Sequence, residues 1–184
     1  MNPRELLKKY APEDDRGRRL LITHSEAVAR FSLQVAQWVP ALTPDLEFIE
    51  EAALLHDIGV VWTHAPTIGC TGSEPYMKHG LLGAELLLRL GFPRHARVCE
   101  CHIGVGLTRE DILAQNLPLP PKDIVPETIE EQIIAYVDNF FSKSTPVPEM
   151  PNHHDMVRAK MASFGERCLA TFDAWAARFG PVEG

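Results

Sequence analysis

The chain has 184 residues, 45% of them hydrophobic, a size and composition typical of one compact domain with a sizeable core. Its 18 basic and 25 acidic residues give a net charge of −7, which argues against a surface that coats a nucleic-acid polymer. The N-terminus is charged, no apolar run approaches the roughly 20 residues that span a bilayer, and the four cysteines follow no disulfide framework, so we expect a cytoplasmic protein with no membrane association.

Helical periodicity extends through the chain and predicts an all-α fold, a single-domain bundle of six to eight helices. The first strong helix is predicted to begin at Thr23, where Glu26 completes a capping-box pattern. His24 shares a stripe with the apolar residues of this helix and should therefore point inward. A second helix is expected from about Thr43-Pro44, with proline at a tolerated first-turn position.

The second helix brings two adjacent metal-binding residue types, His56 and Asp57, to its end. His56 lies on the inner stripe of the helix, and Asp57 follows it directly. Because adjacent helical residues face different directions, both can reach one metal only if the helix ends or distorts nearby. Gly59 is expected to provide that end.

Two middle helices carry further histidines. The third helix is expected from about Tyr76 to Leu90, with His79 in its first turns. The fourth follows Pro93 and carries His102 near its end. His95, close to the start of the fourth helix, is expected to be solvated.

Asp138 lies in a strongly apolar helix that is predicted to begin near Thr128, with Glu131 at capping-box spacing. An unpaired carboxylate in such a helix would be costly, so Asp138 needs a partner: a metal, an arginine or a backbone amide. A short helix is also expected at Thr108, and a last helix, Asn152–Phe179, should close the bundle.

Four histidines and two aspartates thus occupy inner positions on several predicted helices. They are His24, His56, Asp57, His79, His102 and Asp138. Each histidine alone is better explained as a satisfied core or capping residue, but their joint occurrence favours a metal site in the interior, suited to Fe, Mn, Co, Ni or Zn. A soft zinc site at Cys99, Cys101 and His102 is less favoured than buried free thiols, because the spacing is not that of a zinc knuckle.

The order of these residues, with the stretch His56-Asp57-Ile58-Gly59, resembles the HD superfamily of metal-dependent phosphohydrolases in its two-metal form. Residues 102–109 and 125–131 also resemble a group of small standalone HD proteins. The resemblance implies an HD-domain core at 18–143, preceded by an N-terminal segment at 1–17. Residues 144–184 would form a loop and packing helix of the same domain.

By this resemblance, two divalent metal ions would share the six residues, Fe or Mn first, with Ni, Co or Zn as alternatives. One ion would be held by His24, His56, Asp57 and Asp138, and the other by Asp57, His79 and His102. A hydroxide between the metals, oriented by the bridging Asp57, would attack phosphorus in line. The substrate would be a small phosphorylated compound, a nucleotide in the leading hypothesis, cleaved as a monoester or a diester. The sequence favours no particular oligomeric state.

Two positions depart from the family pattern. Val60 stands where many relatives carry a lysine that can meet substrate phosphate, so other groups must supply that contact. Cys101 stands where many two-metal relatives have a second histidine, which argues against a third metal and against cyclic-dinucleotide phosphodiesterase activity. The candidates for substrate contacts are Arg18, Arg19, His64, Thr67, Ser73, Lys78, Arg109 and Lys143.

Loops are expected at His64–Pro75, Leu117–Pro126 and Ser144–Pro151, and the first two are expected to decide the substrate. Two other functions stay open beside hydrolysis. Some HD-fold proteins use nearly the same ligands as mixed-valent di-iron oxygenases, with a polyol or a phosphonate as substrate. A non-catalytic HD module that senses a nucleotide is the third hypothesis, suggested by Val60. Hydrolysis is favoured because none of the primary ligands is missing.

Overall fold

The computed structural model describes residues 2–143 and 147–182 of the chain. Within them lie nine α-helices, and the only strands are two of two residues each, which confirms the all-α prediction. The first helices are α1 (Pro3–Tyr10), α2 (Asp15–Trp38), α3 (Leu46–Leu55), α4 (His79–Arg89) and α5 (Pro93–Cys101). The others are α6 (Arg109–Ala114), α7 (Ile129–Asp138), α8 (His154–Ser163) and α9 (Glu166–Phe179). The strands β1 (His64–Ala65) and β2 (Cys70–Thr71) pair antiparallel in the predicted loop 64–75.

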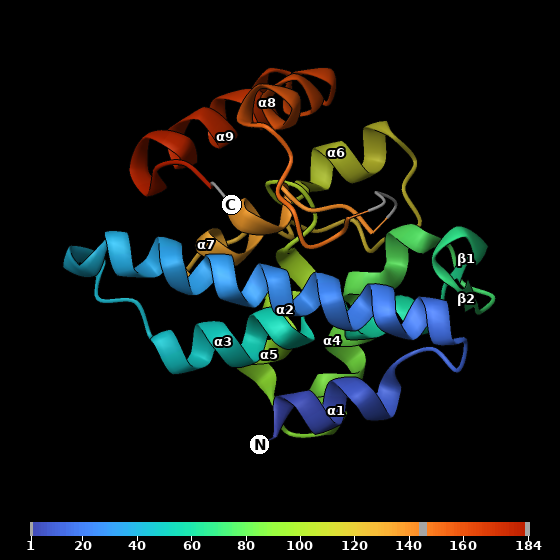
Figure 1. Cartoon of the computed structure of the whole chain (residues 1–184). Coiled ribbons are helices and arrows are strands. Elements are labelled where there is room, and N and C mark those ends of the chain that lie inside the picture. The colour runs from blue at the N-terminus through green and yellow to red at the C-terminus, as the bar shows by residue number, and fades with distance from the viewer. Residues whose placement is uncertain (1, 144–146, 183–184) are drawn as a thin grey trace.

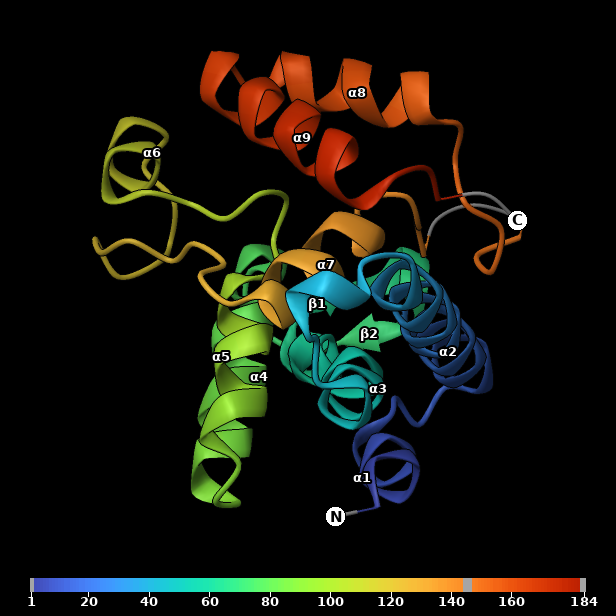
Figure 2. The ribbon, with the colours of Figure 1, turned by 90° about the vertical axis from the view of Figure 1, so that its left-hand side faces the viewer.

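Helix α7 lies in the middle of the molecule, between the α8–α9 pair on one side and helices α2 to α5 on the other (Figures 1 and 2). Its residues Ile133, Ile134 and Val137 are fully buried in the larger hydrophobic cluster, which also takes side chains from α2, α3 and α9. A second cluster lies between α1, α2, α4 and α5. The two clusters surround the region where the predicted metal ligands meet.

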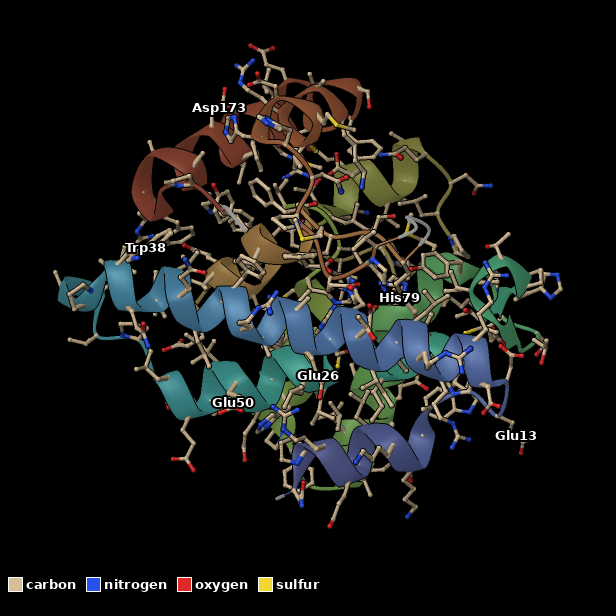
Figure 3. The ribbon with its side chains drawn as sticks, viewed as in Figure 1. Glu13, Glu26, Trp38, Glu50, His79 and Asp173 are labelled. Carbon is tan, nitrogen blue, oxygen red and sulfur yellow. The ribbon has the colours of Figure 1, made fainter. Side chains whose placement is uncertain are left out.

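The N-terminal segment is helical and is tied to the domain. Leu7 of α1 is buried in the second cluster. Arg4 of α1 pairs with Glu26 of α2 at 2.6 Å and with Glu50 of α3 at 3.5 Å. In Figure 3 these two glutamates lie on the outside of the molecule, whereas His79 lies in the interior. Helix α1 therefore covers the end of the bundle formed by α2 and α3.

Several helix limits differ from the sequence-based expectation. Helix α2 begins at Asp15, because the side chain of Asp14 accepts a hydrogen bond from the backbone of Gly17, so a start at Thr23 was wrong. The expected last helix is two helices, α8 and α9, because Gly165 between them has a φ of 113°, a conformation unfavourable to other residues. The predicted loop at 144–151 lies partly outside the described residues.

The second predicted helix also needs correction at both ends. Helix α3 begins at Leu46 with Asp45 as its N-cap, not at Thr43-Pro44. It ends at Leu55, before Gly59, and a 3-10 turn at Ile58–Trp62 follows. The change of backbone direction at His56 and Asp57 is the distortion that a shared metal requires. The capping box expected at Thr128 is present, and the short helix expected at Thr108 also begins with one. The capping box expected at Thr23 is absent, because Thr23 and Glu26 lie inside α2.

His95 is buried rather than solvated. Its Nε2 lies 3.1 Å from the Oε2 of Glu51 on α3, and its ring packs edge-on against Phe48. None of the helices in the described ranges is both long and apolar enough to cross a bilayer.

Candidate metal centre

Six side chains from five helices and their ends converge at the middle of the bundle. His24 comes from the interior of α2, and His56 and Asp57 directly follow α3. The remaining three are at helix limits: His79 is the first residue of α4, His102 follows α5, and Asp138 is the last residue of α7. The four histidines and Asp57 are all at most 5% exposed, and the Asp138 side chain is 17% exposed.

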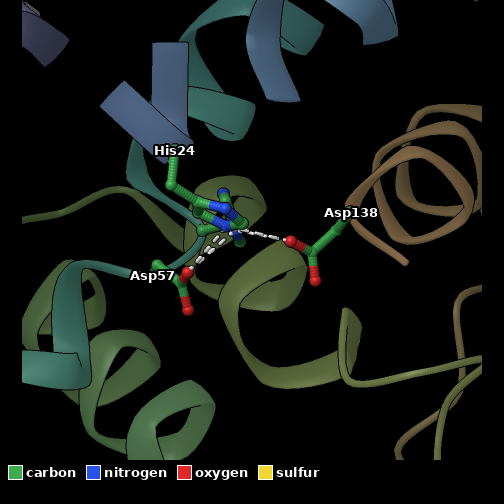
Figure 4. Close-up of side chains that lie close together, drawn as sticks. His24, Asp57 and Asp138 are labelled. Atoms are coloured by element: carbon green, nitrogen blue, oxygen red, sulfur yellow. Dashed lines mark hydrogen bonds and ion pairs between the residues drawn. The ribbon is translucent and has the colours of Figure 1, made fainter. Parts of the chain in front are cut away.

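The first group of ligand atoms comes from His24, His56, Asp57 and Asp138. His24 Nε2 lies 3.1 Å from Asp57 Oδ2 and 3.0 Å from Asp138 Oδ1, contacts that Figure 4 shows with dashed lines. His56 Nε2 lies 3.2 Å and 3.3 Å from the same two oxygens. Two imidazoles and two carboxylates therefore point at one position.

The second group comes from Asp57, His79 and His102. Here the other carboxylate oxygen of Asp57 is used, since Oδ1 lies 3.3 Å from His79 Nε2 and 3.6 Å from His102 Nε2. Asp57 thus turns one oxygen towards each group. This arrangement is the one required of a carboxylate that bridges two metal ions.

The orientation of three imidazole rings is fixed by backbone carbonyl groups. The accepting oxygens belong to Ala53, Tyr76 and Cys99, at 2.6, 2.7 and 2.8 Å from Nδ1 of His56, His79 and His102, respectively. Because a carbonyl oxygen only accepts hydrogen bonds, each Nδ1 carries a proton, and in its neutral form each ring presents an Nε2 lone pair to the centre.

These lone pairs face one another at short range. The Nε2 atoms of His79 and His102 are 3.1 Å apart, and those of His24 and His56 are 3.2 Å apart. The Oδ1 atoms of Asp57 and Asp138 are buried without a hydrogen-bond donor among the described residues. Two facing lone pairs repel unless a proton or another cation lies between them, so the donor set fits divalent cations.

The electrostatics of the buried groups support the same interpretation. Burial favours the neutral form of His56, but the nearby charges of Asp57 and Asp138 outweigh it and raise its pKa to about 10. Burial lowers the pKa of His79, which lies beside only one of the carboxylates, to about 4. Burial would raise the pKa of Asp57, but Lys143 and His56 outweigh it and hold that pKa well below the ordinary value. A concentration of buried negative charge at Asp57 thus attracts cations.

Lys143 supplies one cation from the chain itself. Its ammonium contacts Asp57 Oδ2 and lies 3.2 Å from His24 Nε2, and its side chain is only 11% exposed. Burial opposes this charge, but the negative charge of Asp57 keeps the pKa of Lys143 above its ordinary value. Val60, by contrast, is buried in the second hydrophobic cluster.

A cavity of about 640 Å³ opens onto the centre. His79, His102, Asp138 and Lys143 line one part of it. Among the other sequence candidates, His64 and Thr67 also line the cavity.

The remaining candidates for substrate contacts lie outside the cavity lining. They are Arg18, Arg19, Ser73, Lys78 and Arg109. Arg18 donates from Nε to the carbonyl oxygen of Pro12, Lys78 pairs with Glu74 at 2.7 Å, and Arg109 is exposed. The structure brings none of them to the centre.

Sequence reasoning missed several residues around the centre. The Tyr76 ring stacks on His79 with centroids 4.7 Å apart, and a tyrosine three residues before a predicted ligand was the available signal. Asn139, next to Asp138, donates its amide to the carbonyl oxygens of Gly104 and Ala135 and lines the cavity. Side chains of α8 and α9 also line the cavity, although their sequence indicated only packing.

Proteins of known sequence give several significant similarities. A tRNA (cytidine(56)-2'-O)-methyltransferase of Picrophilus torridus is 36% identical over 146 residues, which cover 74% of this chain and 38% of that protein. A protein of the same name from Thermoplasma volcanium is 36% identical over 139 residues, covering 75% of this chain and 35% of that protein.

An uncharacterised protein of Methanocaldococcus jannaschii is 37% identical over 122 residues, covering 65% of this chain and 64% of its own length. The chain therefore spans between about a third and two thirds of these relatives. No solved structure matches significantly. The HD domain family matches residues 21–142, the segment that contains all six converging side chains, and the chain belongs to that family.

Proposed function

We propose that the chain is a metal-dependent phosphohydrolase that acts on a small phosphorylated compound, a nucleotide in the first instance. The observation that carries the proposal is the pair of ligand groups that share Asp57, whose members His79, His102 and Asp138 line a cavity of about 640 Å³. A cavity of this size is within the range of small-molecule sites, roughly 300–1,000 Å³. Membership of the HD family supports metal-dependent hydrolysis as the chemistry.

Fe or Mn, with Ni, Co or Zn as alternatives, would be held by the two groups, and such ions lower the pKa of bound water and neutralise phosphoryl oxygens. The chain itself holds these ligands rigidly. Asp57 is buried between the groups, and backbone carbonyls fix the rings of His56, His79 and His102. Ligands held by packed helix ends need little rearrangement before they bind.

Lys143 is the residue we assign to substrate phosphate. It lines the cavity beside Asp138, and its ammonium already lies at the carboxylate of Asp57. A charge-assisted hydrogen bond from this ammonium to a phosphoryl oxygen would bind and orient the substrate. Lys143 would then provide the phosphate-binding cation that many relatives carry at the position of Val60.

Two relatives are named as tRNA methyltransferases, and we do not assign methyl transfer to this chain. The matched segments make up 38% and 35% of those two proteins, so most of each lies outside the similarity. An HD segment within proteins named for tRNA modification is nevertheless compatible with a substrate that carries a nucleotide.

The first experiment measures metal content per chain, followed by phosphate release from a panel of nucleotides with Mn²⁺, Fe²⁺, Ni²⁺, Co²⁺ or Zn²⁺ added. Asp57→Ala should abolish both metal binding and phosphate release. Asp155→Ala is the matched control, because that aspartate has a side chain 95% exposed on α8. Phosphate release that survives Asp57→Ala would overturn the proposal. Activity that appears only with oxygen present would favour the oxygenase instead.

A further inference from the structure

One wall of the cavity comes from a part of the chain beyond the family match, which ends at residue 142. Helices α8 and α9 and the turn between them contribute the side chains Lys160, Met161, Phe164, Arg167 and Cys168. Helix α6, which lies within the family match, completes this wall with Asp111, and the residue after it adds Gln115. In Figure 2 these helices lie on the opposite side of α7 from α3, α4 and α5. The same cavity is thus lined by the predicted metal ligands and by a second wall, most of which lies beyond the family match.

This wall is held in place by ion pairs and hydrogen bonds. Arg167 donates from Nη2 to Asp111 Oδ2 at 2.6 Å and to the carbonyl oxygen of Gly106 at 3.0 Å. Asp111 is itself fixed by the capping box with Thr108. Helices α6 and α9 are therefore clamped together across the loop that follows His102, and the wall is preorganised rather than adaptable.

The wall combines an aromatic face with polar groups. Phe164 is 57% exposed although it lines the cavity, whereas the neighbouring Met161 is fully buried. Lys160 and Gln115 are also exposed, and no ion pair of Lys160 occurs among the described residues. A cavity wall that offers an accessible aromatic ring, an amide and a cation suits a nucleobase, since bases stack on aromatic rings and amides pair with their edges.

We propose that this wall is a nucleobase subsite, in which the ring of Phe164 stacks on the base of a nucleotide whose phosphate lies at the metal centre. The inference rests on the proposed phosphohydrolase function and specifies its substrate class. Gln115 offers both a donor and an acceptor to the edge of the base. Lys160 attracts the anionic nucleotide to a chain whose net charge is −7.

The test compares binding and hydrolysis in three variants. Phe164→Leu removes the ring but keeps an apolar side chain, and Phe164→Trp keeps a ring. Met156→Ala is the matched control, because Met156 is an exposed apolar residue of α8, at 64%, that does not line the cavity. Calorimetric titration with nucleosides measures the subsite without any phosphate, and KM is measured for 5'-nucleotides and for ribose 5-phosphate.

We expect Phe164→Leu to weaken nucleoside binding and to raise KM for nucleotides about tenfold or more, with ribose 5-phosphate unaffected. Phe164→Trp and Met156→Ala should behave like the wild type. A 5'-phosphorylated trinucleotide is assayed in parallel. If Phe164→Leu raises KM for the mononucleotides, the substrate is a free nucleotide, and if it raises KM for the trinucleotide, the substrate is an RNA end. Nucleoside binding that is absent, or equal in wild type and Phe164→Leu, overturns the subsite even if phosphate release is seen. Nucleoside binding that depends on Phe164 without any phosphate release overturns the hydrolase and leaves the subsite standing.

Discussion

Gly59→Ala should damage the centre without changing a ligand. Gly59 lies in the 3-10 turn that follows Asp57, and the first turn of α4 packs directly on it. A Cβ atom at Gly59 would lie 2.1 Å from the carbonyl oxygen of His79 and 2.3 Å from the amide nitrogen of Gly83. Both contacts are with backbone atoms, which cannot rotate away as the end of a side chain can.

The size of the effect follows from this geometry. An ordinary contact needs 3.4 Å or more, so α4 and the turn would have to separate by roughly 1 Å. His79 is the first residue of α4, and its Nε2 lies only 3.3 Å from Asp57 Oδ1. Overpacking of this kind costs about 3 kcal/mol of unfolding free energy or more, and the displacement would separate the ligands of the second group.

Denaturant unfolding and metal content per chain would measure both consequences. Gly91→Ala is the matched control, because its φ of 84° disfavours alanine while the added Cβ meets nothing within 4 Å. The control should lose only about 1 kcal/mol and keep its metals. If Gly59→Ala were as stable as Gly91→Ala and bound the same amount of metal, the close packing of α4 on the turn would not position His79.

Three further predictions concern the centre and the thiols. His79→Ala should lower metal content from about two ions per chain to about one, since the first ligand group is left intact; an unchanged content by elemental analysis would contradict the two-group arrangement. Lys143→Met should tighten Mn²⁺ binding by about tenfold in chelator competition, because a cation at Asp57 is removed, and should lower phosphate release; weaker metal binding would contradict this. At pH 8 a thiol reagent should modify only Cys168 in the native protein and all four cysteines after unfolding. Burial raises the pKa of all four thiols, but Cys168 is only partly buried and can meet the reagent, whereas Cys70, with a pKa of about 11, Cys99 and Cys101 are buried and stay protonated. More than one modified thiol in the folded state would contradict their burial.

The sequence predicted which side chains meet, because local patterns determine which face of a helix each residue occupies. His24 lies among apolar residues at helical spacing, and in the structure it is fully buried on the inner side of α2. Asp138 lies in an apolar helix and reaches the same point from α7. Their roles as metal ligands stay predictions that the metal measurements test.

Contacts between distant segments could not be predicted in the same way. Among the cationic candidates, only Lys143 reaches the centre, because it follows α7 closely enough to turn back towards Asp57. Arg18 and Lys78 were also candidates in the sequence but bond to nearby groups instead. His95 looked solvated because its partner, Glu51, lies 44 residues away in another helix. Which surface charge becomes buried depends on how the helices pack.

The geometry of the centre also depends on both local and long-range contacts. His56, His79 and His102 each donate from Nδ1 to the carbonyl oxygen three residues earlier in the chain. The carbonyl groups of Ala53 and Cys99 lie in the last turns of α3 and α5, where helix carbonyls are free to accept such bonds. The carbonyl group of Tyr76 belongs to the 3-10 turn before α4 and also accepts the backbone N–H of His79. The three rings are therefore oriented by backbone close to them in the chain, whereas Nδ1 of His24, inside α2, has no partner among the residues that the structure describes. Helix packing then only has to bring oriented rings together, so substitutions that move a helix end, such as Gly59→Ala, should weaken metal binding as much as the loss of a ligand.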